Sequence, residues 1–291
     1  MVVAPAQGEL NTALAPLFAH IEDAEPIHDD LILASVDMEK HNSALKQVME
    51  AISQTGFMLN TTKCKFGADE IKFWGLVISG NGISPDPEKV DALKYLTAPG
   101  DRDELISFLC MMQSNSEFMP NFARLSSPLR DMTKAGSRFK WTQDHQRCFN
   151  KIIEEFKACT MLQFFDMNKP TFVFIDAHVS GLGAMLAQGT CIEDAKPVLI
   201  ASRTTNKAEE RYPQIDLEAT AIDFALRRFR QYIAGSPKPV TVVSDHQPLC
   251  NIFNEKKRGS VRSERIKLHH QGLNYMVAYQ KGKLNQADLS F

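Results

Sequence analysis

The order of apolar and polar residues in the first part of the chain predicts a hairpin followed by a helix. Two apolar runs between residues 27 and 35 are joined by an acidic turn, which is typical of a hairpin. Apolar side chains then recur at helical spacing, and Gly56 follows as the expected C-cap. The stripe of this helix consists of His41, Leu45, Val48, Met49 and Ile52.

Residues 57–83 are expected to form short strands. An alternating pattern runs without interruption from Ile71 to Ile78, and the sequence Gly-Asn-Gly at residues 80–82 indicates a hairpin turn. Because the residues around Trp74 are apolar on both faces of the strand, we expect this hairpin to be mostly covered by other parts of the protein.

The pattern changes to short amphipathic helices after residue 87. Pro and Gly residues separate these helices, and one of them has an apolar stripe made of Leu105, Phe108, Leu109 and Met112. A further helix begins after Thr142, its expected N-cap. Its stripe consists of Phe149, Ile152, Ile153 and Phe156. Together these helices predict a small helical subdomain.

An α/β module is expected from Lys169 onward. Its strands are predicted where apolar runs lie between turns, at residues 171–175, 181–188 and 240–244. Residues 216–234 have the spacing of a helix between the second and third of these strands. The apolar face of this helix consists of Ile222, Leu226, Phe229 and Ile233.

Composition is that of an ordinary globular protein, since 44% of the 291 residues are hydrophobic and 23% are charged. No apolar run is long enough to span a membrane, and the first ten residues have no secretory signal pattern. The six cysteines form no Cys-x-x-Cys pair, which argues against a zinc site and favours reduced thiols. We therefore expect an intracellular protein, in the cytoplasm or the nucleus, with no membrane partner.

Charge is distributed unevenly between the two halves of the chain. The whole chain has a net charge of −2, yet residues 170–291 hold 16 Lys and Arg against 12 Asp and Glu. This difference suggests two modules, of which the C-terminal one is better suited to bind a polyanion.

Four acids of the C-terminal module are candidate catalytic residues: Asp176, Glu218, Asp245 and Asp288. Asp176 and Asp245 each follow an apolar strand, and two such strand ends can meet at one edge of a sheet. Glu218 lies on the apolar face of the predicted helix, where a carboxylate is unfavourable unless a partner compensates its charge. Clustered carboxylates can hold the two Mg²⁺ ions that hydrolyse a phosphodiester. Each acid by itself is also explained by a turn or by a helix N-terminus.

The residues around these acids form four motifs, at residues 174–184, 201–219, 243–249 and 279–290. In this order they resemble the ribonuclease H motifs of long-terminal-repeat retrotransposon polyproteins of the Ty3/gypsy class. The resemblance implies that Asp176, Glu218, Asp245 and Asp288 are catalytic residues and metal ligands. It also implies two Mg²⁺ or Mn²⁺ ions and endonucleolytic cleavage of RNA in RNA–DNA hybrids. The arginine that usually follows the fourth motif is here Phe291.

Upstream segments resemble the reverse transcriptase of the same polyproteins. Asp29 and Asp30 lie in a turn between two apolar strands, and the segment resembles the YxDD hairpin with Ile27 in place of tyrosine. Residues 59–83 resemble the palm segments and primer-grip hairpin that follow it. Later segments resemble the thumb and the start of the connection, at residues 84–90, 107–109, 118–122 and 139–141.

The expected fold class is α/β, with an α+β palm remnant and a helical thumb followed by an RNase H-like α/β domain with a mixed sheet. The expected domains are a partial reverse transcriptase palm with a truncated N-terminus at residues 1–84, the thumb and connection at residues 85–168, and the RNase H-like domain at residues 169–291.

Two departures from the family pattern concern the polymerase. The thumb has Ser114-Asn115-Ser116-Glu117 where the family has paired tyrosines and arginines, and the family's first polymerase aspartate lies upstream of Met1. We therefore expect Asp29 and Asp30 to be a polymerase remnant, with RNA-directed DNA polymerase activity lost.

A basic stretch is the candidate nucleic-acid-binding site, although it also fits a solvated surface. It consists of Lys256, Lys257, Arg258, Arg262 and Arg265. The expected partner is an RNA–DNA hybrid, and a second copy of the chain or a fuller reverse transcriptase subunit are further expected partners. Two alternatives to the RNase H remain: a catalytically silent fragment that binds nucleic acid, and an active RNA-directed DNA polymerase.

Overall fold

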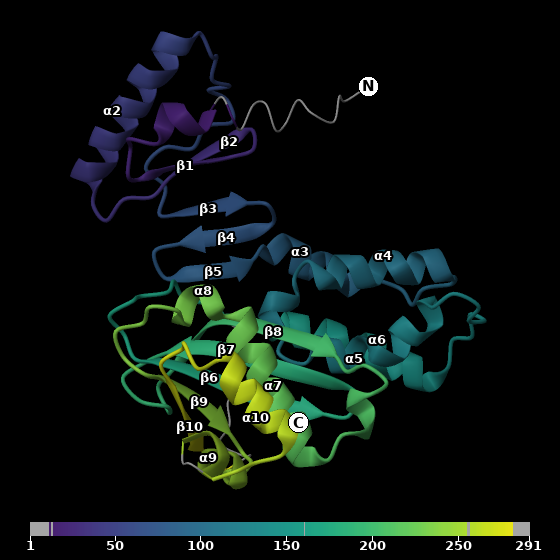
Figure 1. Ribbon diagram of the computed structural model, residues 1–291. Helices are drawn as coiled ribbons and strands as arrows, with labels where there is room; N and C mark the ends of the chain where they lie inside the picture. The colour runs from purple at the N-terminus through teal and green to yellow at the C-terminus, as the bar shows by residue number, and fades with distance from the viewer. Residues whose placement is uncertain (1–11, 13, 160, 255–256, 282–291) are drawn as a thin grey trace. The chain divides into compact units, whose positions relative to one another are not determined.

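The computed structural model describes residues 12, 14–159, 161–254 and 257–281 (Figure 1). The chain divides into two compact units, one ending at Ile71 and the other beginning at Lys72. Both contain helices and sheet, and the larger unit contains a mixed sheet, so the fold class expected from the sequence is confirmed. No helix in the described part of the chain is long and apolar enough to cross a lipid bilayer.

The first unit contains the predicted hairpin and the helix that follows it. β1 (Ala24–Ile27) pairs antiparallel with β2 (Asp30–Leu33). α2 (Met38–Thr55) begins after Asp37, whose side chain accepts a hydrogen bond from a first-turn amide, and ends at Gly56 in the left-handed conformation. The core of this unit consists of Phe18, Ile21, Ala24, Ala44, Val48 and Ile52.

Two details predicted for this region are wrong. Met49 belongs to the predicted stripe of α2 but is 46% exposed, whereas Ala44 is buried. The structure describes all of residues 57–69 and has no strand there, since the chain forms turns and irregular backbone up to Glu70.

A three-stranded sheet follows, in the order β3 (Glu70–Phe73), β4 (Leu76–Ser79) and β5 (Gly82–Pro85). The alternation from Ile71 to Ile78 predicted one strand, but the chain turns at Trp74 and Gly75, which both have positive φ. The expected cover over Trp74 is also wrong, because this side chain is 62% exposed. A glycine inside an alternating pattern permits a turn that the hydrophobic period alone does not show.

Gly82 fixes the contact of β5 with a later part of the chain. Its φ is +139°, and a Cβ there would lie 2.2 Å from the carbonyl oxygen of Leu162. Ile83 and Leu162 exchange two backbone hydrogen bonds of 2.8 Å. Only glycine therefore allows β5 to approach the segment that leads into the large sheet.

A helical segment follows, formed by α3 (Pro87–Ala92), η1 (Leu93–Tyr95), α4 (Arg102–Gln113), η2 (Ser116–Phe118), α5 (Phe122–Thr133) and α6 (Gln143–Lys157). The side chains that were predicted as the stripes of α4 and α6 are all buried. Thr142 caps α6 as predicted and forms a capping box with His145. The apolar stripes of α4, α5 and α6 meet in one core.

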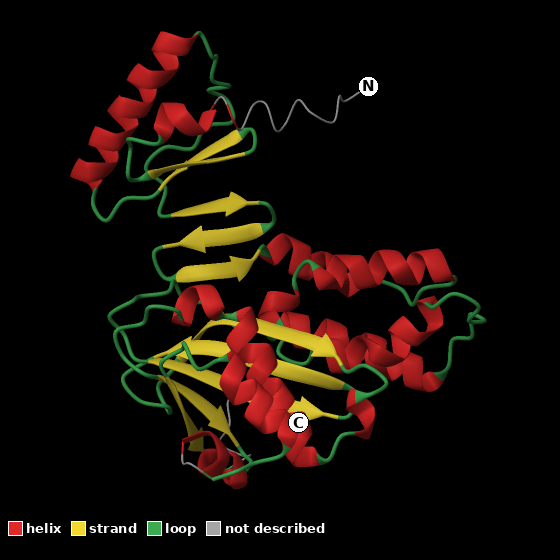
Figure 2. Ribbon diagram, in the orientation of Figure 1, coloured by secondary structure: helices red, strands yellow, loops and turns green. Residues whose placement is uncertain are grey.

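The larger unit is built on a five-stranded sheet in the order β10–β9–β6–β7–β8 (Figure 2). Its strands are β6 (Thr171–His178), β7 (Gly181–Gln188), β8 (Lys196–Thr204), β9 (Val240–Ser244) and β10 (Tyr275–Tyr279). β6, β7 and β8 are antiparallel neighbours, whereas β9 runs parallel to β6 and β10 runs parallel to β9. The predicted strands at 181–188 and 240–244 are confirmed, while β6 continues past Asp176 to His178.

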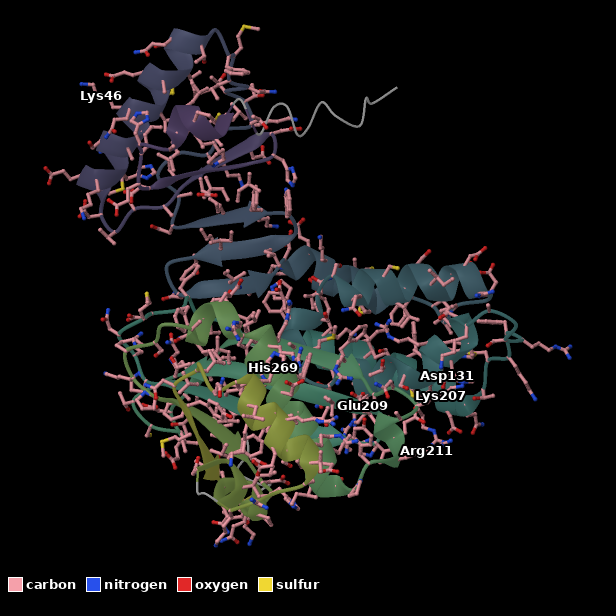
Figure 3. The ribbon with its side chains drawn as sticks, viewed as in Figure 1. Lys46, Asp131, Lys207, Glu209, Arg211 and His269 are labelled. Atoms are coloured by element: carbon pink, nitrogen blue, oxygen red, sulfur yellow. The ribbon has the colours of Figure 1, made fainter. Side chains whose placement is uncertain are left out.

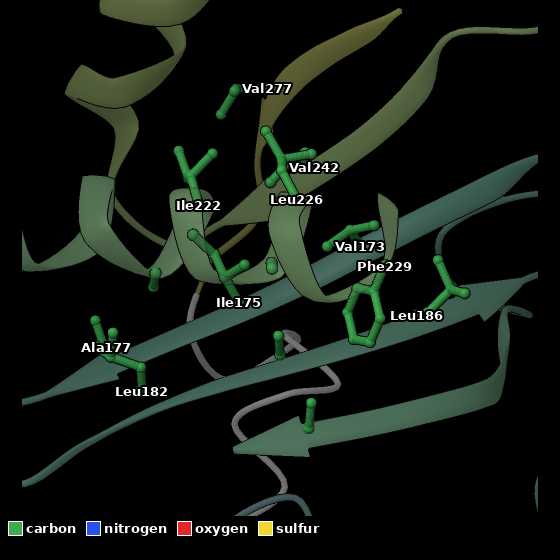
Figure 4. Packing of buried hydrophobic residues seen from close by; sticks show 14 of the residues in the cluster. Val173, Ile175, Ala177, Leu182, Leu186, Ile222, Leu226, Phe229, Val242 and Val277 are labelled. Atoms are coloured by element: carbon green, nitrogen blue, oxygen red, sulfur yellow. The ribbon is translucent and has the colours of Figure 1, made fainter. Parts of the chain in front are cut away.

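Helices cover one face of this sheet. They are α7 (Gln214–Arg228), α8 (Arg230–Ile233), α9 (Gln247–Asn254) and α10 (Val261–His269), with η3 (Glu209–Arg211) before α7. The helix predicted at residues 216–234 is thus two helices, which are separated at Phe229. Its predicted apolar face is buried, and Figure 4 shows Ile222, Leu226 and Phe229 packed against Val173 and Ile175 of β6.

The alternate residues of β6 face a different core. Successive side chains of a strand point to opposite faces, so Phe172 and Phe174 lie on the face away from Val173 and Ile175. There they contact Phe118 of η2 and Leu162, which both precede the sheet in sequence. The helical segment and the sheet therefore share buried apolar surface.

Candidate active site

Asp176 and Asp245 lie at equivalent positions of two neighbouring parallel strands. Phe174 of β6 is opposite Val243 of β9. Asp176 comes two residues after Phe174, and Asp245 comes two residues after Val243. Asp176 lies inside β6 rather than at its end, which corrects the prediction, and Asp245 directly follows β9. The two acids therefore follow the last paired residues of neighbouring strands at the same spacing.

Glu218 lies on α7 and is connected to β6 through Gln214. Its side chain is only 3% exposed, as expected for a residue on the apolar face of the helix. Gln214, one turn earlier, donates hydrogen bonds from Nε2 to Glu218 Oε1 at 3.0 Å and to the Ala177 carbonyl oxygen at 3.2 Å. Because Ala177 follows Asp176, these bonds connect Glu218 to the strand of Asp176. The fourth predicted acid, Asp288, lies outside the described residues.

The donor set of these three acids fits a hard divalent cation. Carboxylate oxygens are the ligands that Mg²⁺ and Mn²⁺ prefer, and a cation would compensate the buried charge of Glu218. Among the residues that the structure describes, no group of three or more His, Cys, Asp or Glu side chains is arranged to hold a metal ion.

Asp216, two residues before Glu218, has a different environment. Arg262 of α10 forms an ion pair with it, with 2.7 Å between Nη1 and Oδ2, and Ser260 donates a hydrogen bond to Oδ1 at 2.5 Å. The Arg262 guanidinium also lies 3.4 Å from the centroid of the Tyr212 ring. Arg262, a predicted nucleic-acid contact, thus has its charge engaged inside the protein.

The other predicted basic residues lie around the start of α10. Lys257, Arg258 and Arg265 are exposed, while Lys256 lies outside the described residues. A depression of about 410 Å³ is lined by Gln247, Pro248, Asn251, Ile252, Lys257 and Arg258. Gln247, one of these lining residues, follows Asp245 by two residues in the chain.

Arg203 and Glu209, which belong to the second motif, form a structural pair. The guanidinium donates two hydrogen bonds to the carboxylate, at 2.7 and 2.8 Å. These bonds hold the pKa of Glu209 below its ordinary value, although burial acts in the opposite direction. Figure 3 shows Glu209 with Arg211 on η3. The pair fastens η3, and with it the entry to α7, to β8.

Asp29 and Asp30 are presented by the β1–β2 hairpin of the first unit. Asp29 lies in the turn and Asp30 begins β2, where it pairs with Ile27, and both acids are exposed. The predicted acidic turn between two strands is therefore confirmed.

Gln214 is the site residue that the sequence reasoning missed. The available signal was its spacing, because residues four apart on a helix are neighbours and Gln214 precedes Glu218 by four. Its second bond, to Ala177, joins segments 37 residues apart and has no local signal.

Comparisons with known proteins agree with this fold. Residues 141–242 match the family profile of the RNase H-like domain found in reverse transcriptase. The chain is 29% identical over 258 residues to the transposon Tf2-3 polyprotein of Schizosaccharomyces pombe and 28% identical to the Tf2-7 polyprotein of the same yeast. Each match covers 88% of this chain and 19% of the relative. Residues 141–242 thus resemble an RNase H-like domain, and the chain spans about a fifth of the length of the transposon polyproteins that it matches.

Solved structures of foamy viral protease–reverse transcriptase have the same fold. The complex with RNA/DNA hybrid has a TM-score of 0.77 at 21% identity and covers 100% of this chain and 39% of that chain. A complex with dsDNA has a TM-score of 0.79 at 21% identity and covers 96% of this chain and 59% of that chain. The mixed helix and sheet architecture is therefore the fold that these foamy viral structures also have.

Proposed function

We propose that this chain provides an RNase H-type endonuclease that cleaves the RNA strand of RNA–DNA hybrids with Mg²⁺ or Mn²⁺. The proposal rests above all on Asp176 and Asp245, which follow paired residues of β6 and β9 at the same spacing, and on Gln214, which donates hydrogen bonds to Glu218 and to the backbone of β6. We also propose residues 169–291 as the RNase H domain, residues 85–168 as a thumb and connection, and residues 1–84 as part of a palm that presents Asp29 and Asp30.

The comparisons support a nucleic-acid substrate. A foamy viral protease–reverse transcriptase of this fold was solved in complex with RNA/DNA hybrid. The curated relatives are transposon polyproteins, of which this chain spans 19%. The excess of positive over negative charge in residues 170–291 is consistent with a polyanionic partner.

In this proposal Asp176, Glu218, Asp245 and Asp288 hold the cations. Two divalent cations in such a site supply an activated water and stabilise the leaving oxygen of a phosphodiester. In this proposal β6, β9 and α7 supply the acids: Asp176 lies in β6, Asp245 directly follows β9, and Glu218 lies on α7. Such a site needs no nucleophilic Ser or Cys.

The test is cleavage of a labelled RNA strand in an RNA–DNA hybrid with Mg²⁺. We expect Asp176→Asn and Asp245→Asn each to lower the rate by several orders of magnitude, because each removes a ligand and its charge. The matched control is Asp144→Asn on α6, whose side chain is 79% exposed. This control should cleave like the wild type.

The assay also separates the alternatives. Near-normal cleavage by either site variant would show that the catalytic acids are elsewhere. A wild type that binds the hybrid but never cleaves it would favour the alternative of a silent nucleic-acid-binding fragment.

A further inference from the structure

The two acids at the start of α7 have partners of opposite kinds. Asp216 is matched by the guanidinium of Arg262, a full positive charge at 2.7 Å. The oxygen of Glu218 at 3.0 Å from Gln214 is held by a neutral amide. The ion pair of Asp216 neutralises that carboxylate, whereas the amide orients Glu218 and adds no charge.

The geometry of Gln214 is suited to positioning. A side-chain amide has two N–H groups, and Gln214 directs one to Glu218 and one to the Ala177 carbonyl oxygen. A glutamate side chain has several rotatable bonds, so a bond to a fixed neighbour reduces the orientations it samples. Because the second bond ends on the backbone of β6, the carboxylate is oriented relative to the strand that holds Asp176.

Asp216 fixes the same turn of the helix from another side. It bonds Ser260, which caps α10, and Arg262, which lies in the first turn of α10. The first turns of α7 and α10 are thereby fastened together. Because these contacts already fix the helix backbone, the bond from Gln214 acts on the orientation of the Glu218 side chain.

We propose that Gln214 is a positioning residue, which holds the Glu218 carboxylate in a fixed orientation relative to β6 so that it can act as a ligand of a divalent cation. This inference rests on the proposed function and names a residue outside its ligand set. Supporting partners of metal ligands typically contribute about 10–100-fold to metal affinity or activity. An amide in this place orients the ligand without competing with the cation for its charge.

The experiment compares the full chain with Gln214→Leu, which has a similar length and no donor. Binding of Mn²⁺ alone is measured by calorimetry, and hybrid cleavage is measured against Mg²⁺ and hybrid concentration. We expect Gln214→Leu to weaken Mn²⁺ binding by about tenfold and to raise the Mg²⁺ needed for half-maximal cleavage by a similar factor. The half-saturating hybrid concentration should change less than about twofold, since the amide acts on the ligand and not on the substrate.

Two matched variants complete the design. Gln271→Leu removes an exposed amide after α10 and should change neither metal nor hybrid dependence. Asp216→Asn should lower the melting temperature while the Mn²⁺ affinity of the folded protein stays close to that of the wild type.

The outcomes separate this inference from the proposed function. If the wild type cleaves and Asp176→Asn does not, but Gln214→Leu binds Mn²⁺ like the wild type, the positioning role is wrong and the proposed function holds. A Gln214→Leu variant with altered hybrid dependence and unchanged metal dependence would also overturn it, because the amide would then act on nucleic acid. A wild type that neither binds Mn²⁺ nor cleaves would refute both.

Discussion

Asp223 on α7 is the centre of a polar network at the other end of the contact between α7 and α10. His270, which is 1% exposed, lies 2.8 Å from Asp223 Oδ1 through its Nε2, and Arg227 donates to both carboxylate oxygens at 2.8 and 2.9 Å. Arg227 also lies 2.8 Å from His269 Nδ1. Burial raises the pKa of Asp223, but the hydrogen bonds from His270 and Arg227 outweigh it, so the pKa lies below its ordinary value of 3.8.

We expect Asp223→Asn to lower the free energy of unfolding at pH 7 by about 1–3 kcal/mol, because it weakens hydrogen bonds of a largely buried charged group. A carboxyl with a lowered pKa in the folded state stabilises the fold above its unfolded pKa, and this contribution is lost as the pH falls through the folded pKa. The part of the difference that comes from the ionised carboxylate should therefore be lost as the pH falls below about 4. Urea unfolding at several pH values measures it, and a difference that does not change with pH would contradict the assignment.

At the scale of single residues, the sequence could indicate each of the candidate site acids but not how they are arranged in space. Asp176, Glu218 and Asp245 follow from apolar strands and a helical stripe, which are local patterns. That β6 and β9 are neighbours depends on the order of strands in the sheet, which residues 172–244 do not encode locally. For the same reason Arg262 looked like a free cation, because its partner Asp216 is 46 residues away.

Among the elements, α9 and the connection to α10 form the nucleic-acid surface that we propose. Lys257 and Arg258 stand at one side of the depression whose other wall is the first turn of α9. Their exposed side chains can follow a phosphate backbone, and A-form-like duplexes are recognised mainly through backbone and shape. Arg265, which is exposed on α10, is a further proposed phosphate contact.

We expect the double variant Lys257→Ala and Arg258→Ala to weaken hybrid binding and to reduce the slope of log Kd against log salt by about 2. Each lost phosphate contact releases about one counterion fewer, which lowers this slope. The matched control is Arg262→Ala, which should lower the melting temperature but leave the slope unchanged, since Asp216 already neutralises that guanidinium. Hybrid binding is measured at temperatures below the melting temperature of each variant. If Arg262→Ala reduced the slope of log Kd against log salt by the same amount, the Arg262 guanidinium would have to leave its ion pair with Asp216 to bind phosphate.

Elements with strong local signals could be predicted, and those held by polar contacts could not. α6 has a capping residue and a continuous apolar stripe, and its limits follow from Thr142 and Phe156. α10 buries only Ser263 and Ile266 among its residues, so its hydrophobic period is weak. It is fastened to α7 by Arg262 and by His270, contacts that no periodicity reveals.

At the scale of the larger unit, the helical segment completes the core of the sheet. Phe118 of η2 is 1% exposed and packs with Phe172 and Phe174 of β6. The amide of Ala123, in the first turn of α5, donates a hydrogen bond to Ser202 of β8 at 3.1 Å. The predicted boundary between residues 168 and 169 lies inside one compact unit that begins at Lys72. A linear pattern shows where composition changes, but it does not show whether two segments bury surface against each other.

We therefore expect the helical segment and the sheet to unfold as one cooperative body. Phe118→Ala removes a fully buried ring between them and should lower the free energy of unfolding by about 3–5 kcal/mol. The matched control, Phe164→Ala, removes a ring that is 50% exposed and should cost less than about 1 kcal/mol. Hydrogen exchange read by mass spectrometry over a urea series follows α6 and β6 separately in the same sample. In the wild type both should lose protection at one midpoint, and Phe118→Ala should shift both midpoints together, because the ring belongs to a core that both segments need. Two separate midpoints, or a shift confined to α6, would mean that the sheet folds without the helical segment.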